Sequence, residues 1–199
     1  MVIQILDRGL YFDSINSPLS PKRGQIWMER NSNGDLVQEW TWNGTYWLSK
    51  TLFHASQVTT GFSGVGIASN NQWAVCPIPN NRFRGLFVVN VSIAVIFSVT
   101  VSSATDYFLF DSLSGGQIYY YNNTSAAILA APVTGLVSIN TQGGASGQIY
   151  STQATNINLA LQNLGQNQYP TSFRTLWQKQ GTSGNSINVT QMIEYRLIR

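Results

Sequence analysis

Residues 83–101 alternate between two kinds of side chain with a period of two. Even positions mix Asn, Ser and Thr with aliphatic residues, whereas every odd position is apolar or glycine: Phe83, Gly85, Phe87, Val89, Val91, Ile93, Val95, Phe97, Val99 and Val101. This is the repeat of a strand with one buried face, and its many β-branched residues favour the same structure. The uncharged stretch 85–105 has the length of a membrane helix, but its residue types predict a strand instead.

This run is longer than the about 3–10 residues of most strands, so we expect a bend, a bulge or a crossing between sheets near its middle. Its even face is more apolar than free exposure to water favours, because it includes Leu86, Val88, Ala94 and Ile96. Packing of loops against this face and packing of another subunit against it explain its apolar composition equally well. Closed symmetric assembly would supply a second cover, and we therefore expect an oligomer.

Shorter alternating segments follow. Segments 106–111 and 117–121 flank a Ser/Gly-rich stretch and predict a hairpin. Segments 173–177 and 187–198 predict two strands joined by a Gly/Asn-rich turn. One face of a further strand would carry Thr155, Ile157, Leu159 and Leu161. Many short strands with polar turns between them predict an all-β fold, an antiparallel β-sandwich of the jelly-roll type.

The first 50 residues differ in composition, because they hold four of the six tryptophans. A Pro/Ser-rich segment precedes three short apolar segments, which are separated by turns at Asn31–Asp35 and Asn43–Gly44 and predict a β-meander. We expect residues 1–53 to form an N-terminal attachment module and residues 54–199 the β-sandwich domain, joined at about residues 52–61. Trp40 and Trp42 would lie on one strand face and form a miniature core.

The module contains a recognisable pattern in Pro21-Lys-Arg-Gly-Gln-Ile-Trp27, the Asn33-Gly34-Asp35 turn and Glu39-Trp-Thr-Trp-Asn-Gly-Thr-Tyr-Trp47. It resembles a recurring phage tail-fibre element, a "GD-W" strand followed by a "W-DG-T-W" hairpin. Together with the final segment Tyr195-Arg-Leu-Ile198, the chain resembles small tail-fibre or virion-surface proteins of cyanobacterial phages and prophages.

That resemblance covers residues 21–48 and the final strand. It implies a homotrimer that docks to other tail or baseplate proteins and meets a host surface. The virion-attachment module would then be the one built on Trp27, Trp40, Trp42 and Trp47.

Composition limits the other classes of function. Charged residues make up only 10% of the chain, and the net charge of +3 is dispersed, so we expect no nucleic-acid partner. The first residues lack the pattern of a signal peptide, which predicts no membrane insertion. With the phage resemblance, this implies synthesis in the host cytoplasm and a location on the virion. Cys76 is the single cysteine and lies in an apolar run, where a buried, inert thiol is expected.

Residues for catalysis are scarce. His54 is the only histidine, no nucleophile motif accompanies it, and no Cys/His spacing suits zinc. Strand periodicity places no two of the candidate acids together, namely Glu29, Glu39, Asp106, Asp111 and Glu194. We therefore expect no enzymatic activity, no metal and no cofactor.

Four aromatic residues are candidates for contact with a glycan or receptor because rings suit the faces of sugars: Trp73, Tyr119, Tyr120 and Tyr121. Packing in a core or an interface is the commoner role of such residues. Together with the resemblance, these residues imply a non-enzymatic phage-tail component, a fibre or receptor-binding protein that contacts host-surface glycan. A capsid decoration or baseplate structural protein and a glycan-cleaving fibre enzyme remain as alternatives.

Overall fold

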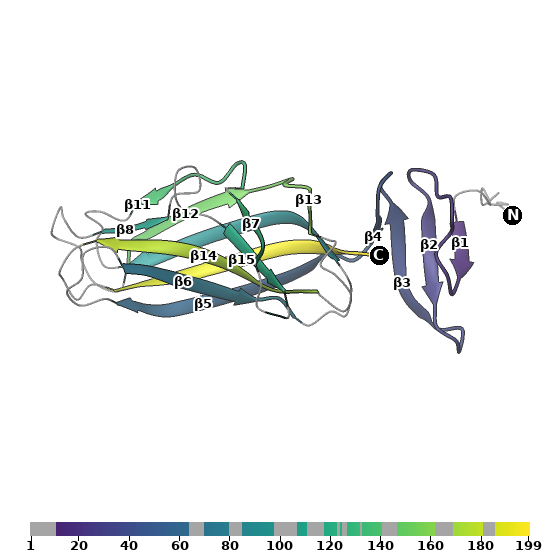
Figure 1. Cartoon of the computed structure of the whole chain (residues 1–199), viewed down its shortest axis with the longest axis horizontal. Coiled ribbons are helices and arrows are strands. Elements are labelled where there is room, and N and C mark those ends of the chain that lie inside the picture. The colour runs from purple at the N-terminus through teal and green to yellow at the C-terminus, as the bar shows by residue number, and fades with distance from the viewer. Residues whose placement is uncertain are drawn as a thin grey trace, which may run out of the picture.

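The computed structural model describes residues 11–63, 70–79, 85–97, 107–110, 118–122, 124, 127–131, 133–140, 147–161, 169–180 and 186–199. These residues contain fifteen strands and no helix. Consequently, this part of the chain holds no helix of the length and apolarity that crossing a bilayer demands. Two sheets form a β-sandwich, and a smaller group of strands lies at one of its ends (Figure 1), which confirms the predicted fold class.

The first sheet has nine strands and runs through both parts of the molecule. All its pairs are antiparallel except that between the first two strands. Its main order is β1 (Tyr11–Ser14), β2 (Ile26–Arg30), β3 (Leu36–Trp42), β4 (Trp47–Ser49), β15 (Ser186–Ile198), β7 (Gly85–Phe97) and β12 (Ile149–Ala154). In addition, β5 (Phe53–Ser63) pairs with β15, and β13 (Leu159–Leu161) pairs with β7.

The second sheet has six strands, with β14 (Pro170–Gln180) near its centre. One edge of β14 pairs with β6 (Asn70–Pro77). The other edge pairs first with β9 (Ile118–Asn122) and then with β8 (Tyr107–Phe110), and these strands continue to β10 (Ala127–Ala131) and β11 (Ile139–Asn140), respectively.

The hairpin predicted from segments 106–111 and 117–121 is therefore wrong. Its two strands, β8 and β9, do not pair with each other but follow one another along the same edge of β14. With 11 residues, β14 is long enough to pair with both short strands in succession. The loop expected between them lies outside the described residues.

The core lies between the two sheets. From the first sheet come the inward-facing residues of β7 and β15, among them Val91, Ile93, Val95, Phe97, Val189, Ile193, Tyr195 and Leu197. From the second sheet come Phe173, Thr175 and Trp177 of β14. Burial of these alternating residues confirms the strand predictions for segments 173–177 and 187–198, and for residues 85–97 of the long run. Its ends, residues 83–84 and 98–101, lie outside the described residues.

A β-bulge interrupts β7 at Val89. The pairing of β7 with β15 shifts there, because Glu194 faces Asn90 whereas the next residue, Tyr195, faces Val88. This confirms the irregularity predicted near the middle of the long run. Beyond the bulge the buried set changes from even to odd positions, so Leu86 and Val88 face the same interior as Val91. Those two side chains therefore need no second cover.

The single strand predicted through residues 155–161 is also wrong. The chain leaves β12 after Ala154 and re-enters sheet pairing only at Leu159, because Asn156 and Asn158 adopt left-handed backbone conformations with φ of 54° and 53°. Asn tolerates this conformation better than other residues with a side chain. The kink lies beside the bulge in β7, where Ile157 N donates to Val89 O at 2.9 Å.

Three strands, β2, β3 and β4, form the predicted meander, and both predicted turns are present. The first turn is held by Asn31 Oδ1, which accepts the N–H groups of Asn33 and Asp35, each at 2.9 Å. Gly34 at its tip has φ of 87°, a conformation that favours glycine. No pattern in the sequence predicted β1, which pairs with β2 in parallel.

The expected connection at residues 52–61 is not a linker, because pairing of β5 with β15 already begins at Phe53. The strands of the module run across the long axis of the sandwich (Figure 1). β15 extends to the module, where Ile198 pairs with Leu48 of β4.

Candidate binding surface

Three aromatic side chains gather on the outer face of the six-stranded sheet. Trp73 comes from β6, and Tyr119 and Tyr121 come from β9, on opposite sides of β14. The ring centroids of Trp73 and Tyr119 lie 4.7 Å apart with the edge of one ring toward the face of the other, and those of Trp73 and Tyr121 lie 6.4 Å apart. Trp73 is 39% exposed, which leaves part of the large indole ring open to a ligand.

Arg174 of β14 lies between these strands and completes the cluster. Its Cζ is 3.8 Å from the centroid of the Tyr121 ring, a cation–π contact, and its Nε donates to Ser172 Oγ at 3.1 Å. Cα pairing places Arg174 beside Tyr119 on one side and beside Val75 on the other. We call Trp73, Tyr119, Tyr121 and Arg174 the aromatic surface.

Tyr120, the fourth aromatic candidate, is not on this surface. The expectation that it is exposed is wrong: the side chain is fully buried and packs against Phe173 with ring centroids 5.8 Å apart. Alternation along β9 turns it to the opposite side from its two tyrosine neighbours. Its buried hydroxyl has no hydrogen-bond partner in the described part of the chain, and desolvation raises the pKa of that hydroxyl.

Arg174 was missed by reasoning from sequence, although a signal was present. Phe173 and Trp177 are large apolar residues at alternate positions of the predicted strand, so alternation places Arg174 on the opposite face from them. What the pattern could not show is that β9 lies on the opposite edge of β14 from β6. This strand order brings residues that are distant in sequence onto one surface.

The four tryptophans of the module form its core. Trp27 stacks on Trp40 with centroids 6.1 Å apart and meets Trp47 at 5.8 Å, and Trp42 contacts Trp47 at 5.5 Å. Trp27, Trp40 and Trp47 are buried, and Trp42 is half-buried. The structure thus confirms a tryptophan core, and any docking partner of the module would meet its other residues.

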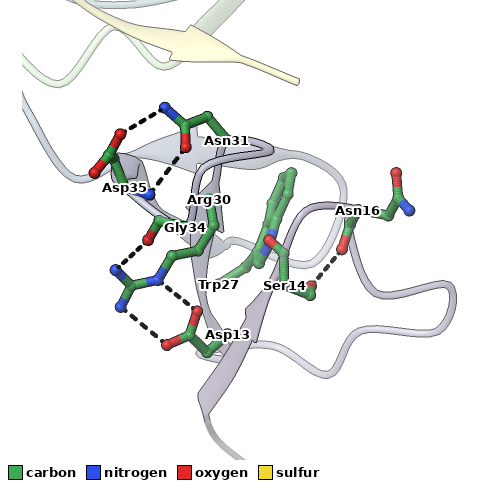
Figure 2. Close-up of polar contacts among 8 residues, drawn as sticks. All are labelled: Asp13, Ser14, Asn16, Trp27, Arg30, Asn31, Gly34 and Asp35. Carbon is green, nitrogen blue, oxygen red and sulfur yellow. Dashed lines mark hydrogen bonds and ion pairs between the residues drawn. The ribbon is translucent and has the colours of Figure 1, made fainter.

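An ion pair ties β1 to β2 (Figure 2). Arg30 Nε and Nη2 donate to the two carboxylate oxygens of Asp13 at 2.7 and 3.0 Å, while Nη1 donates to Gly34 O at 3.1 Å. The hydrogen bond from Arg30 lowers the pKa of Asp13, and the pKa of Arg30 is raised in return. Trp27 Nε1 adds a hydrogen bond to Ser14 O at 2.9 Å. These contacts anchor the edge strand of the module.

The remaining chemically active residues form no larger cluster among the described residues. His54 is exposed on β5 and is the Cα partner of Glu194 on β15, whose carboxylate accepts a hydrogen bond from Asn90 Nδ2. Glu29 and Glu39 lie on opposite faces of the meander, and each contacts its own basic partner, Arg199 and Lys50, respectively. Within the described ranges, no three His, Cys, Asp or Glu residues are grouped as a metal site.

Cys76 is buried as predicted, and desolvation raises the pKa of its thiol to about 11. Asp106 and Asp111 lie outside the described residues. The aromatic surface, in contrast, offers ring faces and a guanidinium, which are groups for noncovalent contact.

No protein-family model matches the chain, and no curated protein sequence matches it. Solved structures of infectious bursal disease virus show a distant likeness. The Gx strain gives a TM-score of 0.31 at 12% identity, and the Gt strain gives 0.29 at 13% identity. Each alignment covers 92% of this chain but only 50% and 47% of the viral chains, so this chain spans about half their length. At these TM-scores the likeness carries no argument about function.

Proposed function

We propose that the protein is a non-enzymatic structural component of a phage tail, a fibre or receptor-binding protein, whose sandwich contacts host-surface glycan. The observation that carries this proposal is the gathering of Trp73, Tyr119 and Tyr121 on one outer sheet face. Aromatic rings pack well against the C–H faces of sugars. Such partly exposed rings cost little side-chain entropy when a ligand orders them, because each has only two side-chain torsions.

We propose that the N-terminal module, residues 1–53, attaches the sandwich to the particle. Its resemblance to the tail-fibre element supports this role, as does its tryptophan core, which gives a small unit the buried area it needs for stability. Arg196 of β15 helps to join the two parts, because Nη1 donates to Ser49 O and Lys50 O at 2.7 and 2.6 Å. The contact supports a fixed presentation of the sandwich.

A homotrimer is part of the proposal. The bulge in β7 moves Leu86 and Val88 to the inner face and turns Phe87 and Val89 to the outer face, where both are half-buried. Ala94 and Ile96 are also half-buried on that outer face, which supports a subunit contact. Light scattering after size exclusion should give a mass three times that of the 22.0 kDa chain, whereas a monomer would contradict this part.

Binding to host cells and to their purified surface polysaccharide tests the proposed function. We expect Trp73→Ala to weaken binding by about tenfold or more, as truncation of a central aromatic contact usually does. Tyr11→Ala is the matched control, because Tyr11 is 42% exposed but lies on β1 of the module, away from the aromatic surface.

Two results would contradict the proposal. One is that the folded wild-type protein binds neither cells nor polysaccharide. The other is labelling of intact particles that places the chain in the capsid lattice, which would favour the decoration-protein alternative.

A further inference from the structure

Charge is distributed unevenly between the two sheets. The six strands of the second sheet contain two basic residues, Arg174 and Lys179, and no acidic residue. Asp106 and Asp111 flank β8 but lie outside the described residues. The described acids all belong to the nine-stranded sheet or to the turns of the module: Asp13, Glu29, Asp35, Glu39 and Glu194. The described part of the face around Arg174 therefore favours anions.

Arg174 itself is held in place but not neutralised. The Tyr121 ring and Ser172 Oγ engage one side of the guanidinium. No carboxylate in the described residues forms an ion pair with it, and no acceptor for Nη1 or Nη2 is found among those residues. A guanidinium presents paired N–H groups that match the two oxygens of a carboxylate. Because packing already restricts this side chain, binding such a group costs less conformational entropy.

We propose that the aromatic surface recognises an acidic glycan, one whose sugars carry carboxylates. In this assignment Arg174 binds a sugar carboxylate and the neighbouring Trp73 packs against a sugar face. The inference rests on the proposed function and adds the chemical class of the ligand. A neutral glycan would leave the charge of Arg174 without a counterpart beside the rings.

The test uses one polymer in two charge states: de-esterified polygalacturonate, and the same chain with its carboxylates methyl-esterified. At about 0.15 M salt, where long-range attraction is screened beyond about 8 Å, we expect the acidic form to bind at least tenfold more tightly. Arg174→Gln should abolish this preference. Arg174→Lys should keep part of it, because the charge remains while the paired donor geometry is lost. Trp73→Ala should weaken both forms.

Arg23→Gln is the control for general charge, because Arg23 is an exposed basic residue of the module. Equal binding of the two polymers, with Arg174→Gln without effect, would overturn the acidic-glycan inference and leave the glycan-binding function standing. If Arg23→Gln and Arg174→Gln reduce the preference for the acidic polymer equally, the assignment of carboxylate binding to the aromatic surface is overturned. If the folded wild-type protein binds neither polymer nor any host glycan, the proposed function fails together with the inference. Thermal denaturation shows that each variant is folded.

Discussion

Arg199 Nη1 lies 2.8 Å from Glu29 Oε1, so the residue after β15 contacts a carboxylate in the second strand of the module. Glu29 is buried, and its other oxygen accepts a hydrogen bond from Trp40 Nε1 at 2.8 Å. The Arg199 guanidinium also lies 5.5 Å from the centroid of the Trp27 ring. One carboxylate thus connects the tryptophan core of the module to the strand that leaves the sandwich.

Replacement of Glu29 by alanine should lower the free energy of unfolding by about 1–3 kcal/mol, because Trp40 Nε1 loses this buried acceptor. Glu29→Gln retains an oxygen that accepts the hydrogen bond from the indole. Its loss in the free energy of unfolding should be less than about half of that for Glu29→Ala. Arg199→Ala should cost only about 0–1 kcal/mol, since Arg199 is 45% exposed and its ion pair is partly screened. Urea denaturation at one fixed protein concentration measures all three.

The ranking of these three variants by their free energy of unfolding is the informative result. If Arg199→Ala is as costly as Glu29→Ala, the ion pair rather than the indole hydrogen bond is the main contribution of Glu29. A double variant distinguishes coupled from independent contributions.

A buried hydrogen-bonded chain crosses between the two sheets. Thr175 Oγ1 of β14 donates to Gln191 Oε1 of β15 at 2.8 Å and accepts from Trp177 Nε1 at 2.9 Å. Thr175→Val removes both bonds while nearly preserving volume, so two buried polar groups lose this partner. We expect a loss of about 2–4 kcal/mol.

Thr175→Ser is the matched control, since it keeps the hydroxyl and removes one methyl group at a cost of about 1 kcal/mol. Thermal or urea unfolding measures both variants. A valine variant no less stable than the serine variant would show that the hydroxyl contributes nothing. Gln191 Nε2 has no partner in the described part of the chain, so adding Gln191→Met to Thr175→Val should recover stability.

Alternation predicted the buried face of β15 and that of β7 from Val91 to Phe97, because burial on one face of a strand imposes a period of two. It placed Phe87 and Val89 on the buried face, where the bulge puts Leu86 and Val88 instead. It did not predict Gln191 as a buried residue, since its polarity breaks the apolar pattern and its partner Thr175 comes from a different sheet. Nor could it give the pairing of β8 and β9 with β14. That pairing depends on contacts between segments distant in sequence, and the local Ser/Gly-rich stretch favoured a hairpin instead.

The aromatic surface was predictable only in part. Trp73 stood out beside a polar stretch, but its contact with Tyr119 requires that β6 and β9 flank the same strand. Tyr119, Tyr120 and Tyr121 looked equivalent in the sequence. Only the identity of the buried face on β9, set by contact with Phe173, separates Tyr120 from the other two.

The kink between β12 and β13 should tolerate glycine and reject β-branched residues. Asn158 has φ of 53° and is exposed, so a substitution there changes backbone strain with little change in burial. Asn158→Val should lose about 1–2 kcal/mol relative to Asn158→Gly, because a β-branched side chain is strained in the left-handed region. Both variants lose the hydrogen bond from Asn158 Nδ2 to Asn156 O, so their difference isolates the backbone effect. Equal unfolding free energies would contradict a left-handed Asn158.

Cys76 should be protected from alkylation until the sandwich opens. Its thiol is fully buried, and desolvation raises its pKa to about 11, so at pH 8 the reactive thiolate is a small fraction of the folded population. We expect iodoacetamide to label the native protein at least tenfold more slowly than the urea-unfolded protein, in which the thiol recovers its ordinary pKa. Raising the pH from 7 to 9 should increase labelling of the unfolded chain steeply, because the thiolate fraction keeps rising as the pH approaches the ordinary thiol pKa. Native labelling should remain slow, because reaction also requires opening of the strand pair β6–β14 that holds Cys76 opposite Phe173. Mass spectrometry of intact protein during a labelling time course measures both rates, and rapid labelling under native conditions would show that this edge of the second sheet opens readily.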